Sequence, residues 1–193
     1  MIIDFDLKIN NYNKRIEEKT LDYDCPNCRA WRSTKYYGTY TRYALILTDD
    51  GTQIEDHLLT IKRVICKSCK KTHAVLPSDI IPYKQYSLSM YLIILQQILI
   101  IETPEKKELM NQLPHQLVYE ILRVWREFLA SIESLLRVTY QIYLSEEEKI
   151  LQFVISRINS VSKQYVKNYK WMLFMTHHQK QNPKKITIGI SEI

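Results

Sequence analysis

The sequence predicts an α+β protein, with an antiparallel β unit first and an all-helical domain after it. Residues rich in Tyr, Thr and aliphatic side chains fill positions 31–65, as is typical of β-strands. After Pro77 and Pro82 the apolar spacing changes to helical period. Of the 193 residues, 46% are hydrophobic and 25% charged, so the chain can bury a sizeable core and is not disordered. We expect an N-terminal extension, a β unit, a helical domain and a basic tail, at 1–24, 25–82, 83–176 and 177–193.

All four cysteines fall in two CxxC pairs, Cys25–Cys28 and Cys66–Cys69. Two such pairs can point four thiolates at one ion and complete a tetrahedral site that suits Zn²⁺. The spacer between the pairs is longer than usual. It holds a strand at 31–47, a turn at 48–51 and a returning strand at 52–65, and a third strand follows at 73–76. The pattern predicts a zinc ribbon with a long hairpin and one structural zinc ion. A redox pair or disulfides are the alternative, which a second CxxC and the expected reducing compartment disfavour.

The compartment follows from what the sequence does not contain. The first ten residues carry acids where a secretory signal needs basic residues. The apolar stretch from Met90 to Ile101 is about 12 residues long, too short to span a bilayer. We therefore expect a cytoplasmic protein with no membrane contact and with cysteines that are reduced or metal-bound. His73, four residues after Cys69, is expected beside the metal site or at the surface, since four thiolates already complete the site.

Charge and composition exclude several functions. No glycine lies between Gly51 and Gly189, so standard phosphate-binding glycine loops are excluded. All aspartates lie at or before Asp79, which argues against a two-metal nuclease core in the second half. We therefore expect no enzyme and name no catalytic residue. The net charge is +6, and from Lys149 to Ser191 there are eight Lys or Arg and no acid. This indicates a phosphate-facing segment, although an ordinary solvated surface is the alternative.

The helical half predicts a helix-turn-helix at about 104–129. Ser87 can cap a first helix to about Ile101, Thr103-Pro104-Glu105 begins a short helix to about Asn111, and a long helix starts near His115. At 100° per residue one side of the long helix is an apolar stripe, Leu117, Ile121, Val124, Trp125, Phe128 and Ile132. The opposite side carries the predicted DNA contacts, His115, Gln116, Tyr119, Arg123 and Arg126. Arg can read guanine and Gln adenine in the major groove; the alternative is a solvated face on a helix pair.

A last helix is expected from a capping box at Ser145–Glu148 to about Phe174. Its apolar stripe is Ile150, Val154, Ile158, Val161, Tyr165, Tyr169 and Met172. Its exposed side offers further phosphate contacts, Arg157, Lys163, Lys167 and Lys170. Beyond it, residues 186–190 are expected as a short strand or a docking peptide.

The run CPNC … IKRVICKSCKKTHAVLPSDIIPYKQYS resembles the N-terminal zinc ribbon of bacterial insertion-sequence transposases. In these proteins a CPxC pair, a basic strand, a CxxC pair and an LP ending precede a helix-turn-helix. The run looks closest to an uncharacterised bacterial family of short zinc-ribbon proteins associated with mobile elements. The resemblance covers Cys25 to Ser87 and extends weakly to Leu129. It implies that the four cysteines are zinc ligands and that Arg123 contacts DNA. A full transposase continues into a catalytic domain that this chain does not contain, so only DNA recognition is implied.

We expect a zinc-ribbon and helix-turn-helix DNA-binding protein, an accessory or end-recognition component of a mobile genetic element without its own catalytic domain. Its expected partners are DNA and a transposase or recombinase encoded nearby. The alternative is a zinc-ribbon adaptor for protein–protein interaction. In that case the aromatic residues of the hairpin form a partner surface or a stacking platform for single strands: Trp31, Tyr36, Tyr37, Tyr40 and Tyr43. An enzyme whose acids are not grouped in the sequence is a third alternative.

Overall fold

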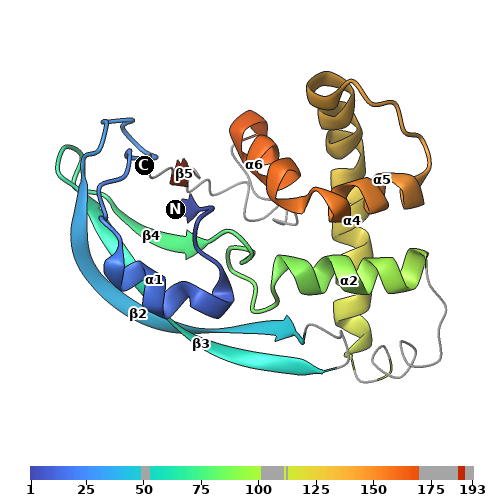
Figure 1. The fold of residues 1–193 in the computed structure, drawn as a ribbon, viewed down its shortest axis with the longest axis horizontal. Coiled ribbons are helices and arrows are strands. Elements are labelled where there is room, and N and C mark those ends of the chain that lie inside the picture. The colour runs from blue at the N-terminus through green and yellow to red at the C-terminus, as the bar shows by residue number, and fades with distance from the viewer. Residues whose placement is uncertain (49–52, 101–110, 112, 170–186, 190–193) are drawn as a thin grey trace.

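A mixed β-sheet with helices gathered at one end forms the fold, as the predicted α+β class requires (Figure 1). The structure is a computed structural model that describes residues 1–48, 53–100, 111, 113–169 and 187–189. The strands lie in the order β2-β3-β4-β1-β5. Their bounds are β1 Ile2–Asp4, β2 Thr34–Leu47, β3 Ile54–Cys66, β4 Thr72–Pro77 and β5 Thr187–Gly189. Strands β2, β3 and β4 are antiparallel neighbours, whereas β1 runs parallel to both β4 and β5.

The long hairpin of β2 and β3 matches the expected pair of strands. It pairs from Thr34 opposite Cys66 to Leu47 opposite Ile54, with one register shift between Tyr36 and Gly38. Such a bulge adds a residue to one strand and increases its twist, and the hairpin is visibly curved in Figure 1. The expected turn lies largely outside the described residues. The strand starts later than expected, because residues 31–33 form the approach to the strand, with a left-handed Arg32 at φ 40°.

The N-terminal residues, expected as an extension, contribute strand β1 to the sheet. Ile2 and Ile3 are fully buried, as is typical of a parallel strand that is covered on both faces. A 3₁₀ turn, η1 Ile9–Asn11, leads into helix α1, Tyr12–Glu18, which packs on β3. At the other end of the chain, β5 falls within the expected strand at 186–190.

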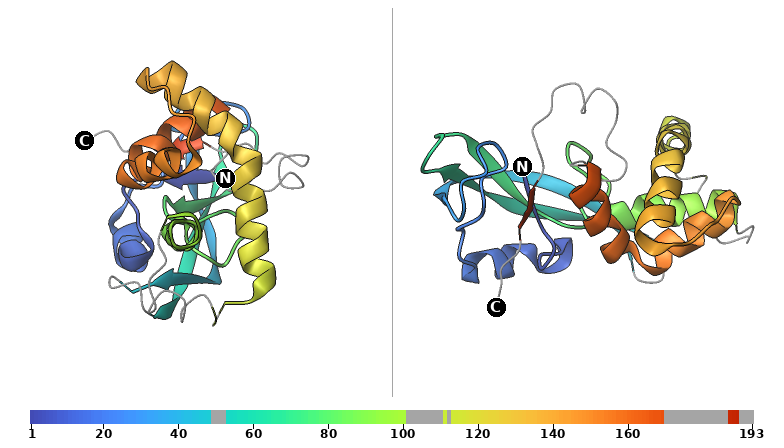
Figure 2. Two further views of the ribbon diagram at one scale, coloured as in Figure 1. Left: turned by 90° about the vertical axis from the view of Figure 1, so that its right-hand side faces the viewer. Right: turned by 90° about the horizontal axis from the view of Figure 1, so that it is seen from above.

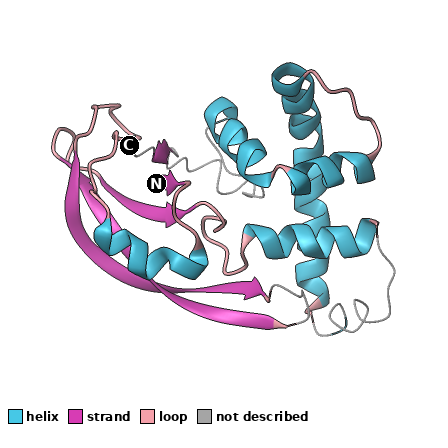
Figure 3. Cartoon of the chain, in the orientation of Figure 1, coloured by secondary structure: helices cyan, strands magenta, loops and turns pink. Residues whose placement is uncertain are grey.

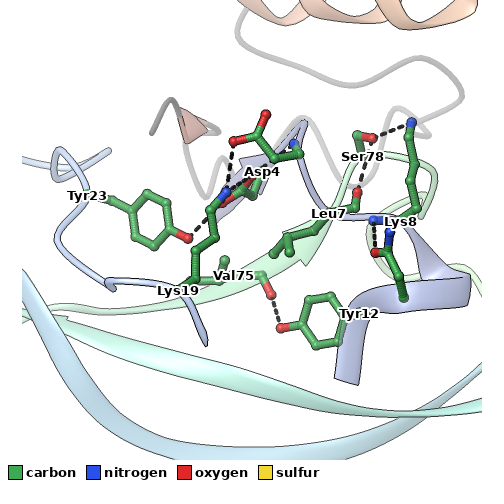
Figure 4. Close-up of polar contacts among 10 residues, drawn as sticks. Asp4, Leu7, Lys8, Tyr12, Lys19, Tyr23, Val75 and Ser78 are labelled. Atoms are coloured by element: carbon green, nitrogen blue, oxygen red, sulfur yellow. Dashed lines mark hydrogen bonds and ion pairs between the residues drawn. The ribbon is translucent and has the colours of Figure 1, made fainter. Parts of the chain in front are cut away.

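A buried carboxylate joins β1 to the segments that follow it (Figure 4). Both oxygens of Asp4, whose side chain is 0% exposed, accept hydrogen bonds from Lys19 Nζ at 2.7 Å. The Tyr23 hydroxyl donates to the same carboxylate at 2.7 Å, and the Asp6 N–H donates at 3.0 Å. Burying a charge is costly unless it is paired and hydrogen-bonded, and these donors satisfy that condition.

Helical segments follow β4 and gather at one end of the sheet, while α1 lies over the sheet itself (Figures 1 and 3). They are α2 Leu88–Leu99, α4 His115–Leu135, the π-helical turn η2 Leu136–Tyr140, α5 Glu147–Ser156 and α6 Ile158–Tyr169. Helix α4 stands across α2 (Figure 2). The Ser87 side chain caps α2 as expected, because it accepts the Met90 N–H. No helix among the described residues has the length and apolar character needed to cross a membrane.

The apolar stripe predicted for α4 is confirmed, because its members Leu117, Ile121, Val124, Trp125, Phe128 and Ile132 are all buried. Trp125 Nε1 donates to Glu147 Oε1 at 2.7 Å and so ties α4 to α5. Phe128 packs against Tyr165 of α6 with ring centroids 5.6 Å apart. The short helix expected before α4 lies outside the described residues, apart from Asn111.

The expected continuous last helix is wrong, because the chain breaks between α5 and α6 at Arg157, whose φ is −131°. The Phe153 carbonyl still accepts the Arg157 N–H at 3.2 Å, and the Val161 N–H donates to the Arg157 carbonyl at 2.9 Å, so one helix ends and a new one starts at this residue. Helix α5 is preceded by Glu146, and no side-chain cap bond forms there, so the expected capping box is absent from this described segment. The break lets buried residues of both helices reach the core, among them Val154 and Val161. Met172 and Lys170 lie outside the described residues.

Candidate functional site

The two CxxC pairs fold into turns with the same backbone geometry. The Cys25 carbonyl accepts the Arg29 N–H at 2.9 Å, and the Cys66 carbonyl accepts the Lys70 N–H at 3.1 Å. Arg29 and Lys70 have φ values of 61° and 60°, in the left-handed region that favours glycine. The first turn leads towards β2 and the second joins β3 to β4, so the sheet brings together two pairs that the sequence keeps apart.

The four sulfur atoms meet in one cluster. Cys25 Sγ lies 3.6 Å from Cys69 Sγ, and Cys28 Sγ lies 3.7 Å from Cys66 Sγ. All four lie within 4.8 Å of one another, and none of the cysteines is in a disulfide. A tetrahedral ion with metal–sulfur bonds of about 2.3 Å would hold its sulfurs roughly 3.8 Å apart. The cluster therefore fits one metal ion.

Neighbouring side chains tune the thiols. The His73 ring is buried, with Nε2 3.4 Å from Cys25 Sγ, so His73 lies beside the cluster. Burial raises the pKa of Cys25 to about 12. At Cys66 burial also raises the pKa, but hydrogen bonds from the Ser33 hydroxyl and the Cys69 N–H outweigh it and bring the pKa of Cys66 to about 6. Burial lowers the pKa of His73 to about 4, so its ring is neutral at pH 7. A neutral ring adds no positive charge that would compete with a bound cation.

The chemistry open to such a cluster is limited. Four sulfur ligands fill every position around a tetrahedral ion, so none is left for water or substrate. The arrangement therefore suits an ion that stabilises the fold. An ion bound there would tie the segment before β2 to the end of β3 and to the turn that leads into β4, since these carry the four cysteines.

A groove next to the cluster is a feature that the sequence reasoning missed. A cavity of about 770 Å³ lies between the cysteine turns, β3, β4 and the segment that leads to α2. Its lining includes the cations Arg63, Lys70 and Lys71 together with Tyr40 and Tyr83. The basic run around the second CxxC pair was visible in the sequence, but Tyr40 and Tyr83 are brought to it only by the fold.

The predicted DNA contacts on α4 share one exposed face. His115, Gln116, Tyr119, Arg123 and Arg126 are all exposed, opposite the buried stripe. Arg123 is paired with Glu127 one turn further on. Part of the face is hollowed, with a shallow cavity of about 420 Å³ lined by Tyr119, Leu122, Arg123, Arg126 and Glu127.

The predicted phosphate contacts of the last helix divide between two elements. Arg157 follows α5, while Lys163 and Lys167 belong to α6, and all three are exposed. The Arg157 guanidinium lies 5.4 Å from the centre of the Phe153 ring. Lys170 lies outside the described residues.

Comparison with known proteins bears on the first part of the chain. A family model described as Domain of unknown function (DUF6431) matches residues 25–112. The match contains all four cysteines and ends before α4, so it covers the cysteine cluster but not the exposed α4 face. No curated protein and no solved structure matches the chain. Over less than half its length, the chain is thus similar to a family of unassigned function, whose description names neither a transposase nor a zinc ribbon.

Proposed function

We propose that the chain is a DNA-binding protein organised by one structural zinc ion. The observation that carries the proposal is the division of α4 into a buried stripe and an exposed face with an amide, two guanidinium groups, an imidazole and a phenol. This face extends from His115 to Arg126, about 17 Å of helix at 1.5 Å per residue. Amide and guanidinium groups are the side chains that read adenine and guanine in the major groove.

The ion pair on this face does not oppose DNA binding. Arg123 and Glu127 are both partly exposed, 44% and 35%. An exposed pair at this helical spacing contributes only about 0.3–0.5 kcal/mol. A bidentate contact between Arg and guanine discriminates against a wrong base by about 1–3 kcal/mol, so the weak pair with Glu127 is a small obstacle to base reading by Arg123.

Zinc is the ion that this donor set favours. Thiolates are soft ligands, and a closed tetrahedral four-sulfur site is typical of structural zinc. We expect one zinc per chain, and we expect Cys25→Ser and Cys69→Ser to release it and to unfold the hairpin, because the metal supplies folding energy. Elemental analysis of freshly purified, reduced protein tests this, with Ser68→Ala as a control inside the second pair. Reduced protein without zinc would refute the assignment.

Within this function we propose the role of an accessory or end-recognition component of a mobile element, working with a transposase or recombinase encoded nearby. The resemblance of Cys25–Ser87 to transposase zinc ribbons supports this role. The chain alone is expected neither to cut nor to join DNA with Mg²⁺ or Mn²⁺, because the proposed zinc site has no open position. Metal-dependent cleavage that Asp24→Asn abolishes would contradict it.

The experiment that tests DNA recognition separates base reading from phosphate binding. A preferred duplex is first selected from a random pool, and affinities are then measured at two salt concentrations. Arg123→Ala should cost about 1–3 kcal/mol on the preferred duplex and much less on random duplex. The matched control is Arg137→Ala, which removes the same charge about 21 Å further along the helical segment.

The exposed basic side chains on and before α6 should behave differently from Arg123. Replacing Arg157, Lys163 and Lys167 together should weaken binding to every duplex and flatten the salt dependence by about 0.9 in slope for each lost contact. If Arg123→Ala and this triple variant lose affinity equally on preferred and random duplex, the proposed reading role of α4 fails.

A protein-interaction adaptor remains the second candidate because Trp31 is 77% exposed beside the first cysteine turn. Large exposed aromatic side chains are enriched at protein interfaces. The Arg32 guanidinium lies 5.5 Å from the centre of the Trp31 ring, and both side chains could contact a partner protein. This candidate predicts weak DNA binding that is indifferent to Arg123→Ala.

A further inference from the structure

The groove beside the cysteine cluster collects cations that lack an acidic partner. Arg63, Lys70 and Lys71 line it, and no carboxylate does so among the described residues. Across the described ranges none of these three forms an ion pair, whereas Lys19, Lys62, Lys84 and Arg123 all do. Three cations without a carboxylate partner around one concavity attract an anion.

Their polar contacts leave these cations available. Arg63 donates to the Thr72 hydroxyl at 3.0 Å and Lys71 Nζ donates to Asn27 Oδ1 at 3.2 Å. Each acceptor is neutral, so the contact orients the side chain without pairing its charge with a carboxylate. Arg63 also lies 5.4 Å from the centre of the Tyr37 ring, which holds the guanidinium in place against an aromatic face.

Aromatic rings stand in the same groove. Tyr40 of β2 and Tyr83 both line it, and their exposed fractions are 38% and 54%. Tyr83 has a φ of 66°, a left-handed conformation that a bulky residue adopts at a cost. The fold thus places two tyrosines and three cations around one cavity of about 770 Å³.

We propose that this groove binds single-stranded nucleic acid, with phosphates at Arg63, Lys70 and Lys71 and unpaired bases against Tyr40 and Tyr83. Cations that follow the backbone, together with aromatic faces that stack on bases, are the combination by which proteins hold single strands. In a duplex the bases show only their edges, in the grooves, so tyrosines within a concavity can stack only on bases that are unpaired.

The position of the groove agrees with the proposed function, on which this inference rests for the class of partner. Tyr83 is followed by Lys84, which pairs with Glu120 of α4. Glu120 neighbours Tyr119 on the exposed α4 face. A nucleic acid with a duplex on α4 could therefore place an unpaired end in the groove.

The test uses the zinc-loaded full chain and fluorescence anisotropy with labelled oligothymidylate and oligouridylate, each about 12 nucleotides long. The structure supplies a matched pair of variants. Lys70→Gly and Arg29→Gly remove one positive charge each, at equivalent left-handed positions of the two cysteine turns, but only Lys70 lines the groove. We expect Lys70→Gly to weaken single-strand binding and to lower its salt slope by about 0.7. Arg29→Gly should change neither, and zinc content is measured for both.

A second variant tests stacking without disturbing the fold. Tyr83→Asn suits the left-handed backbone, since Asn tolerates it better than most residues. It should weaken single-strand binding about fivefold or more and leave the salt slope unchanged. Tighter binding of oligothymidylate or of oligouridylate would identify DNA or RNA as the single strand preferred, and either result supports the proposal.

Arg123→Ala separates this proposal from the role of α4. Loss of duplex recognition in Arg123→Ala with intact single-strand binding supports both. If the chain binds duplex as proposed but does not bind single strands, the groove proposal is overturned and the proposed role of α4 is unaffected. If the chain binds single strands but its duplex affinity does not change in Arg123→Ala, the groove proposal is supported and the proposed role of α4 is overturned. Equal weakening by Lys70→Gly and Arg29→Gly would also overturn the groove, since it would indicate general charge loss.

Discussion

Asp4 offers the sharpest test of how the sheet supports the cysteine cluster. Its fully buried carboxylate holds Lys19 and Tyr23, and Tyr23 lies two residues before Cys25. The Tyr23 backbone in turn takes part in two hydrogen bonds, one to the Thr34 side chain and one from the Ser33 N–H. Asp4→Asn keeps the size of the side chain but removes its charge. It should therefore loosen the entry to the first cysteine turn as well as β1.

The expected magnitude follows from the partners that lose the charge. Breaking a buried ion pair costs about 3–5 kcal/mol, because the remaining charge is left uncompensated. Lys19 is 15% exposed and keeps a second contact, to Asp6 at 2.9 Å, so we expect the lower end, about 3 kcal/mol. Tyr23→Phe removes only one hydrogen bond to a charged group and should cost about 1.5–3 kcal/mol.

The assay is urea unfolding of zinc-loaded protein followed by circular dichroism, with zinc release to a chromogenic chelator measured in parallel. Asp6→Asn is the control, since this carboxylate is 54% exposed and its pair with Lys19 should contribute less than about 1 kcal/mol. Asp4→Asn protein that is as stable as Asp6→Asn, or that releases zinc at the wild-type rate, would refute the coupling of β1 to the cluster.

Two further predictions concern the backbone and pH. Arg29→Gly should stabilise the fold by about 0.5–1 kcal/mol, because a left-handed L-residue costs about 1–2 kcal/mol and the greater freedom of glycine in the unfolded chain offsets part of that gain; a lower urea midpoint would contradict it. Burial raises the pKa of Asp79 above its usual value, so the folded state binds this proton more tightly than the unfolded chain does. The stability that Asp79 contributes is therefore present at low pH and is lost as the pH rises through the raised pKa. Asp79→Asn should make the urea midpoint less dependent on pH above about 4, and a pH profile parallel to the wild type would count against it.

The features predicted from the sequence are those that local patterns encode. The long strands, the four-cysteine cluster and the buried stripe of α4 each follow from spacing within one segment or from two short motifs. The break at Arg157 was missed because the apolar spacing continues across it, so the sequence pattern holds no signal that separates α5 from α6. Strand β1 was missed because its three residues, Ile2 to Asp4, are too few to show alternation, and its partners β4 and β5 lie far away in the sequence.

The groove was unpredictable for a related reason, and its construction shows what the metal would contribute. Its cations sit on β3 and the second cysteine turn, while Tyr40 and Tyr83 come from other segments. The contact from Lys71 to Asn27 joins the two cysteine turns directly, so a cation of the groove is held by the first turn as well as by its own. An ion bound by four thiolates would fix both turns at once. It would thereby also fix the distances among the groove cations Lys70, Lys71 and Arg63. A closed metal site that does no chemistry can thus still determine binding, because it sets the geometry of the charges beside it.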